Sequence, residues 1–125
     1  MPEATRLLHV EDDDSLRTFV GHVLQQAGFT VESVSNGLEA LKTLAHQTAA
    51  HDLVILDLVL PWVNGIDVLA KLRSDPATRK MPVLITTGTM VSPKQFAGDR
   101  RVSVLKKPFD EQQILVAVES LLYAS

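Results

Sequence analysis

Acidic residues directly follow two apolar segments of this chain. Glu11 and Asp12 come after the segment that ends at Val10, and Asp57 comes after Leu56. Three carboxylates within a few ångström of one another repel, and proteins tolerate this mainly where a cation neutralises them. A set of oxygen ligands favours Mg²⁺, which keeps waters that a phosphate can replace. If the fold brings these three residues together, they predict a Mg²⁺ site that receives a phosphoryl group.

Other residues suit phosphoryl transfer to a carboxylate. A carboxylate can attack phosphorus to give an acyl phosphate when a metal, a positive charge and a hydroxyl act on the phosphoryl oxygens. Asp57 suits the nucleophile because it ends an apolar run and precedes a turn. Lys107 would supply the charge and Thr87 the hydroxyl. Thr87 is preferred to Thr86 because it is followed by Gly88, which leaves room for a phosphate.

Five β-type segments carry these residues, at positions 6–10, 29–34, 52–57, 82–87 and 102–105. Their alternation with helical patterns predicts an α/β fold, with a parallel sheet and helices on both faces. Leu53 to Leu56 form a continuous apolar run, which is typical of a strand buried on both sides. We therefore expect the segment at 52–57 to be central.

Amphipathic spacing predicts helices over residues 14–27, 37–46, 65–73 and 111–123. The stretch between the last two strands differs from these. Ser92 and Pro93 suit the start of a helix, but Gly98 follows only a few residues later. We expect a short and weak fourth helix there.

The carboxyl ends of parallel strands form the edge at which open α/β sheets bind ligands. The first strand delivers Glu11 and Asp12 to that edge, the third delivers Asp57, the fourth Thr87 and the last Lys107. Three carboxylates, a hydroxyl and an ammonium are therefore predicted to converge on one rim.

Taken in order, these residues resemble the response-regulator receiver family of two-component signal transduction. Pro61 and Gly65 after Asp57, and Pro108-Phe109 after Lys107, complete the match, which covers residues 6–123. The resemblance implies a doubly wound five-stranded sheet of order 2-1-3-4-5. It also implies a phosphoacceptor regulator rather than an enzyme, phosphorylated by a sensor histidine kinase or a phosphotransfer protein.

The resemblance further assigns roles to single residues. Asp57 would accept the phosphoryl group, and Asp12, Asp57 and the main-chain carbonyl of Val59 would bind Mg²⁺, with Glu11 acting on the metal through water. Thr87 and Lys107 would contact the phosphoryl oxygens, and their shift would signal to a downstream protein.

The sequence departs from the family pattern near its end. Val104 stands where many receivers carry an aromatic switch residue, and the interval from Thr87 to Lys107 is shorter than usual. An atypical output face is therefore expected. Val59 and Thr89 occupy positions that tune dephosphorylation in the family. Because the Val59 side chain cannot hydrogen-bond an attacking water, we hypothesise a long-lived phosphoryl group.

Bulk properties fit one domain over residues 1–125, with no output domain. The chain is 46% hydrophobic, which is enough for a core, and it has no cysteine, which excludes disulfides and thiolate sites. No apolar run could span a membrane, so a stand-alone cytoplasmic protein with no membrane partner is expected. A net charge of −3 argues against direct nucleic-acid binding.

Three other functions fit less well. A nucleotide- or flavin-binding module needs a Gly- or Ser/Thr-rich loop after the first strand, where this chain is acidic. A phosphohydrolase usually carries a second acid two residues after its nucleophile, where this chain has Val59. A phosphorylation-independent docking module on a receiver fold stays open as the main alternative, because of Val104 and the shortened fourth helix.

Overall fold

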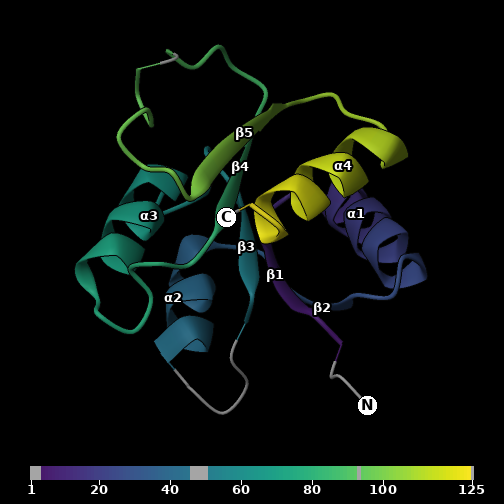
Figure 1. The fold of residues 1–125 in the computed structure, drawn as a ribbon, viewed down its shortest axis with the longest axis horizontal. Helices are drawn as coiled ribbons and strands as arrows, with labels where there is room; N and C mark the ends of the chain where they lie inside the picture. Colours follow the sequence, from purple (N-terminus) through teal and green to yellow (C-terminus); the bar gives the residue numbers. More distant parts are fainter. Residues whose placement is uncertain (1–3, 46–50, 93, 125) are drawn as a thin grey trace.

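The computed structural model describes residues 4–45, 51–92 and 94–124, within which five strands and four helices form (Figure 1). The strands are β1 (Arg6–Val10), β2 (Thr30–Val34), β3 (Leu53–Asp57), β4 (Val83–Thr87) and β5 (Val102–Lys106). The helices are α1 (Asp14–Gln26), α2 (Gly37–Ala45), α3 (Gly65–Ser74) and α4 (Glu111–Leu122). The last of these, α4, is the helix predicted over residues 111–123.

The strands form one parallel sheet in the order β2-β1-β3-β4-β5, as the resemblance implies. The prediction that the third strand is central is confirmed, and every residue of β3 is buried. Val10 pairs with Leu56 across β1 and β3. This register brings the residues that follow β1 next to Asp57 at the end of β3.

Helices cover both faces of the sheet, with α1 and α4 on one side and α2 and α3 on the other (Figure 1). Successive strand residues point to opposite faces, so Leu7 and Leu8 of β1 enter different cores. The core under α1 and α4 contains Leu7, Val20, Leu24, Ile55, Leu84, Ile114 and Val118. The core under α2 and α3 contains Leu8, Val10, Leu44, Leu56, Val68, Leu72 and Ile85.

The prediction of a short fourth helix between β4 and β5 is wrong for the described residues. Residues 94–98 form turns instead. The amide of Gln95 donates to the carbonyl of Ser92 at 3.0 Å, and the amide of Asp99 donates to the carbonyl of Phe96 at 3.0 Å. These bonds span three residues, whereas an α-helix needs a spacing of four. A segment this short that also contains a glycine gains too few such bonds to offset the cost of starting a helix.

The turn segment is nevertheless attached to the rest of the domain. Phe96 packs against the core under α2 and α3. Arg73, in the last turn of α3, donates from Nε to Asp99 at 2.6 Å and from Nη1 to the carbonyl of Met81 at 2.8 Å. Arg73 thereby links the turn segment that precedes β5 to the loop that precedes β4.

Two predicted positions cannot be placed. His46, the last residue of the helix predicted over 37–46, and Pro93, the predicted first residue of the fourth helix, both lie outside the described residues. Elsewhere the ends of the predicted elements agree with the observed ones to within a residue or so.

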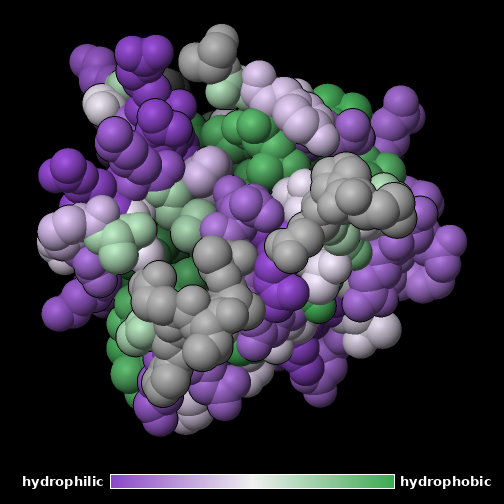
Figure 2. All heavy atoms as spheres, turned by 60° about the horizontal axis from the view of Figure 1, so that its bottom comes forward, coloured by the Kyte–Doolittle hydropathy of each residue, from purple (hydrophilic) through white to green (hydrophobic). Residues whose placement is uncertain are grey.

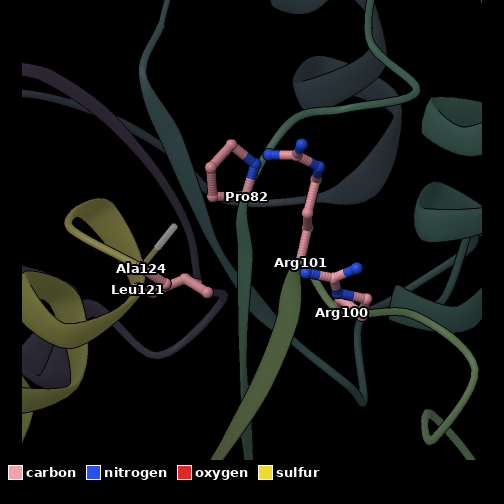
Figure 3. A pocket seen from close by; sticks show the side chains of 5 residues that line it. All are labelled: Pro82, Arg100, Arg101, Leu121 and Ala124. Atoms are coloured by element: carbon pink, nitrogen blue, oxygen red, sulfur yellow. The ribbon is translucent and has the colours of Figure 1, made fainter.

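Among the described residues, the amino ends of the strands carry no cluster of metal-ligating side chains. Figure 2 shows this end of the molecule, where hydrophilic side chains cover most of the visible surface. A cavity of about 260 Å³ opens here (Figure 3), lined by Pro82, Arg100, Arg101, Leu121 and Ala124. It lies at the start of β4 and β5 and so at the opposite end of the sheet from the acidic rim. Among the described residues, no helix is long and apolar enough to cross a membrane.

Candidate functional site

The predicted rim forms at the carboxyl edge of the sheet. Glu11 follows β1, and its amide donates to the carbonyl of Val34 at the end of β2 at 3.1 Å. Asp57 is the last residue of β3. Lys107 follows β5, and its amide donates to the carbonyl of Thr87 at the end of β4 at 2.7 Å. Main-chain bonds that continue the sheet therefore set the positions of all the strand-end residues.

Glu11, Asp12 and Asp57 form a carboxylate cluster. One carboxylate oxygen from each lies within 4.8 Å of the others. Glu11 and Asp57 are buried, at 1% and 5% exposed, whereas Asp12 is exposed. The three carboxylates that the sequence predicts to converge are thus together, with one of them open to solvent.

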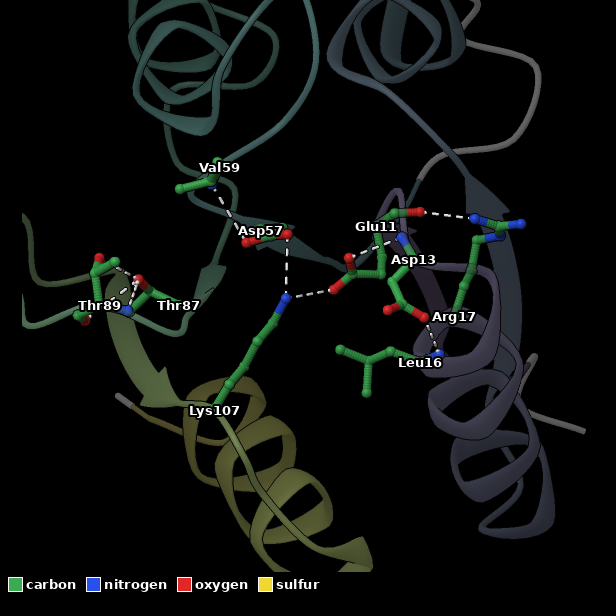
Figure 4. Close-up of polar contacts among 9 residues, drawn as sticks. All are labelled: Glu11, Asp13, Leu16, Arg17, Asp57, Val59, Thr87, Thr89 and Lys107. Atoms are coloured by element: carbon green, nitrogen blue, oxygen red, sulfur yellow. Dashed lines mark hydrogen bonds and ion pairs between the residues drawn. The ribbon is translucent and has the colours of Figure 1, made fainter.

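Lys107 reaches into this cluster and bridges its two buried members (Figure 4). Its Nζ lies 2.8 Å from Oε1 of Glu11 and 3.1 Å from Oδ2 of Asp57. Burial of the ammonium favours its neutral form, but the two carboxylates outweigh burial and raise the pKa of Lys107. Lys107 therefore carries its charge throughout the physiological range.

Glu11 responds in the opposite way to its surroundings. Its Oε2 accepts from the amide of Asp13 at 3.1 Å, in addition to the bond from Lys107 to Oε1. Burial nevertheless raises the pKa of Glu11, because desolvation, with help from the Asp57 charge, exceeds these two hydrogen bonds. Without a metal, the charged form of Glu11 is therefore disfavoured at the rim.

His9 is a residue of β1, two positions before Glu11, and is 1% exposed. Burial, followed by the positive charges of Lys107 and Arg17, lowers the pKa of His9 to about 3. The imidazole is therefore neutral at physiological pH, and it adds no charge to the site.

Thr87 lies on the same rim but does not contact the carboxylates. Its Oγ1 accepts from the amide of Thr89 at 3.1 Å and lies 3.0 Å from the Thr89 hydroxyl (Figure 4). Thr86 is equally buried, and its Oγ1 has no hydrogen-bond partner among the described residues. Of the two threonines, Thr87, the last residue of β4, is the one whose hydroxyl is bonded, to Thr89 on the loop that follows β4.

At the far end of the loop that follows Asp57, Gly65 lies directly against the main chain of Asp57 and Leu58. A Cβ at Gly65 would lie 2.4 Å from the Asp57 carbonyl oxygen and 2.8 Å from Cα of Leu58. Only glycine permits this approach, which presses the start of α3 against the end of β3. The amide of Val59 lies 3.3 Å from Oδ1 of Asp57, so the Val59 main chain borders the carboxylate.

Trp62, at the tip of that loop, has an unusual conformation. Its φ is 64°, and the amide of Val63 donates to the carbonyl of Pro61 at 2.8 Å, which closes a three-residue turn around it. Such turns are strained for a residue with a Cβ. Trp62 is 80% exposed, so most of its surface is open to solvent.

Sequence reasoning missed Arg17, a residue of α1. Its Nη1 donates to the main-chain carbonyl of Glu11 at 2.9 Å (Figure 4). The sequence offers one signal for this side chain, because Asp14 stands three residues before it and such pairs meet on a helix. That signal suggests only a surface ion pair and not a contact with the rim.

A divalent cation that prefers oxygen ligands fits this cluster. The donors are carboxylate oxygens on one side of a rim that opens to solvent at Asp12, and no sulfur lies among them. Burial raises the pKa of Glu11 although Lys107 lies beside it, and a bound cation would favour the charged form of this carboxylate. Glu11, Asp12 and Asp57 are therefore suited to Mg²⁺.

The doubly wound parallel sheet is a CheY-like receiver fold, and it carries a lysine and three carboxylates at its carboxyl edge. A family model described as the response regulator receiver domain matches residues 7–119. The chain belongs to the response-regulator receiver family. Receiver domains act in two-component signal transduction with histidine kinases and are regulators rather than conventional enzymes.

The chain is similar to several transcriptional regulators. The probable transcriptional regulator ycf29 of Pyropia yezoensis is 36% identical over 119 residues, covering 94% of this chain and 53% of that protein. The regulatory protein SphR of Synechococcus elongatus, named for alkaline phosphatase synthesis, is 37% identical and covers 98% and 50% respectively. The chain spans about half the length of these curated relatives.

Solved structures agree on the fold. Chemotaxis response regulator CheY4 of Vibrio cholerae superimposes with a TM-score of 0.83 at 29% identity, covering 95% of this chain and 99% of that chain. A response regulator receiver protein from Sinorhizobium medicae gives 0.83 at 30% identity, covering 98% and 97%.

Proposed function

We propose that Asp57 is a phosphoacceptor, which takes a phosphoryl group from a histidine kinase or a histidine phosphotransfer protein. One observation carries the proposal: Lys107 Nζ lies 3.1 Å from Asp57 Oδ2 and 2.8 Å from Glu11 Oε1, inside a cluster of three carboxylates. A carboxylate beside a fixed ammonium at the edge of the sheet is a nucleophile with a charged partner for the incoming phosphoryl oxygens.

The residues that would hold Mg²⁺ are Asp12, Asp57 and the main-chain carbonyl of Val59, with Glu11 acting through water. When bound, Mg²⁺ neutralises negative charge on the phosphoryl oxygens and on the carboxylates. Glu11 keeps Lys107 aligned with Asp57, since both carboxylates bind the same ammonium.

The transfer itself forms a bond between an Asp57 carboxylate oxygen and phosphorus while the bond between phosphorus and the donor imidazole nitrogen breaks. The donor imidazole, protonated on its other ring nitrogen, leaves as a neutral ring. Lys107 then binds a phosphoryl oxygen. The Thr87 hydroxyl must exchange Thr89 for a phosphoryl oxygen, and this exchange would move the loop after β4.

A second candidate function is a docking module that works without phosphorylation. Two observations favour it: turns replace the expected fourth helix, and Val104, in place of an aromatic switch residue, is 43% exposed on β5. A module of this kind would bind Mg²⁺ and take up no phosphoryl group.

The wider setting is also a proposal. We propose that residues 1–125 act as one cytoplasmic receiver domain with its own downstream partner and without direct contact to nucleic acid or membrane. RpaA of Synechocystis, which is 35% identical to the chain, is named as a DNA-binding regulator, but the chain covers only 48% of it. The absence of nucleic-acid contact therefore stays a prediction for residues 1–125.

The mass of the intact protein after incubation with acetyl phosphate and Mg²⁺ tests the proposed function. We expect a gain of one phosphoryl group that is lost in Asp57→Asn and after addition of EDTA. No gain in the wild type, together with measurable Mg²⁺ binding, would favour the docking module instead.

A further inference from the structure

Four consecutive acids, from Glu11 to Asp14, take different partners in the structure. The Glu11 carboxylate points into the rim and binds Lys107. Asp12 contributes an oxygen to the cluster. The Asp13 side chain caps α1 by accepting from the amide of Leu16 at 2.9 Å. Asp14 lies outside the rim, with 89% of its side chain exposed.

A run of four acids has no unique way of presenting two of them to a cation. A shift of the turn by one residue would present Asp12 and Asp13 instead, and a shift by two would present Asp13 and Asp14, and in each case Asp13 would no longer cap α1. The sheet register fixes Glu11 at the end of β1, so a further contact is needed only to hold the path of the turn at residues 12–14.

Arg17 makes that contact. Its Nη1 donates to the Glu11 carbonyl at 2.9 Å, and its Nη2 binds Oδ1 of Asp14 at 2.5 Å. The Arg17 side chain is only 23% exposed, and its guanidinium joins the first and the last acid of the run. With Arg17 in place, the amide, carbonyl and both carboxylate oxygens of Glu11 all have partners.

We propose that Arg17 is a positioning residue of the metal site: it anchors the turn at 11–14 so that Asp12 faces Glu11 and Asp57 while Asp14 is held away. The inference rests on the proposed Mg²⁺ site. Arg17 touches none of the reacting groups and acts through the main chain of Glu11. Groups that orient metal ligands in this way typically change metal affinity about 10- to 100-fold when they are lost.

The sign of the effect separates positioning from simple charge. A guanidinium near a cation site repels the cation, so removal of its charge alone would tighten Mg²⁺ binding. Loss of the anchor would weaken Mg²⁺ binding. Arg17→Lys keeps the charge and a helix-compatible side chain but cannot bind the carbonyl and Asp14 together, while Arg17→Gln removes the charge as well.

Arg73 offers a matched control at the other end of the sheet. It also joins a main-chain carbonyl, that of Met81, to a carboxylate, that of Asp99. Arg73→Lys therefore breaks the same kind of contact far from the rim. The dissociation constant for Mg²⁺ would be measured on the full chain by isothermal titration calorimetry, with unfolding midpoints in urea recorded for every variant.

We expect the Mg²⁺ dissociation constant to rise about tenfold or more in both Arg17→Lys and Arg17→Gln, and to stay within about twofold of the wild type in Arg73→Lys. Unchanged affinity in Arg17→Lys, or tighter binding in Arg17→Gln, would overturn the positioning role. If the wild type binds no Mg²⁺ in the same titration, the proposed metal site itself fails, and the inference falls with it.

Discussion

Replacing Glu11 by glutamine should stabilise the domain in the absence of Mg²⁺ and weaken its response to Mg²⁺. Burial raises the pKa of Glu11, so its charged form is less stable in the fold than in the unfolded chain. The favourable contribution of this group is complete below its ordinary pKa of 4.5 and is lost as pH rises through the raised folded value. At neutral pH Glu11 therefore costs stability.

The magnitude follows from the distances. At separations of 4.8 Å or less and an effective dielectric constant of about 20, each of the other two carboxylates repels Glu11 by at least about 3.5 kcal/mol, before solvent screening at the exposed Asp12 is counted. Lys107 at 2.8 Å returns about 6 kcal/mol, so the charges nearly cancel. The cost of burying the Glu11 charge, several kcal/mol, is left over. In the Glu11→Gln variant the side-chain amide avoids this cost, but it forms weaker hydrogen bonds to Lys107 and Asp13, which offsets about 1–3 kcal/mol of the gain.

We expect a net gain of about 1–2 kcal/mol for Glu11→Gln at pH 7, which is about 4 °C in Tm for each kcal/mol. Urea unfolding followed by far-UV circular dichroism, with and without Mg²⁺, would measure the gain and the smaller Mg²⁺ effect. Glu39→Gln, an exposed acid on α2, is the control and should change stability by less than about 0.5 kcal/mol. A less stable Glu11→Gln in EDTA, or an undiminished Mg²⁺ effect, would refute the reasoning.

Three further predictions concern other parts of the domain. Val59→Asn should shorten the lifetime of the phosphoryl group severalfold, because its amide can orient an attacking water; decay no faster than in the wild type, followed by mass spectrometry, would count against this. Gly65→Ala should lower the free energy of unfolding in urea by about 2 kcal/mol or more, since its Cβ would meet the Asp57 carbonyl oxygen at 2.4 Å. Gly21→Ala in α1, whose Cβ would meet nothing within 4 Å, should raise it by about 0.5–1 kcal/mol. Equal effects of the two substitutions would contradict the role given to the Gly65 contact. Burial of Asp99 would raise its pKa, but the hydrogen bond from Arg73 outweighs burial and lowers it. The stability that this ion pair contributes is therefore present above the ordinary pKa of 3.8 and is lost as pH falls through the lowered value. Asp99→Asn should remove that part of the acid dependence of unfolding, and an unchanged dependence would contradict it.

Most of the fold was predictable because its signals are local. The apolar run at Leu53 to Leu56 predicts a doubly buried strand, and β3 is one. The convergence of Glu11, Asp12 and Asp57 followed from the rule that parallel strands end at the same edge. Both predictions use only the identity of residues and their order along the chain.

The errors arose where distant contacts decide the structure. Ser92 suits the start of a helix, but the segment instead settles through Phe96 on the core and through Asp99 on Arg73. Arg17 looks like half of a surface ion pair, because its bond to the Glu11 carbonyl depends on how α1 leaves β1. The bond between Thr87 and Thr89 likewise depends on the path of the loop after β4.

The most direct test of the central claim is to locate the phosphoryl group among the neighbouring carboxylates. Borohydride converts an acyl phosphate to an alcohol, so treating the phosphorylated protein and sequencing its peptides by mass spectrometry identifies the acceptor residue. The account predicts homoserine at position 57 and unmodified residues at Glu11 and Asp12. Modification at Glu11 or Asp12 with Asp57 intact would contradict it.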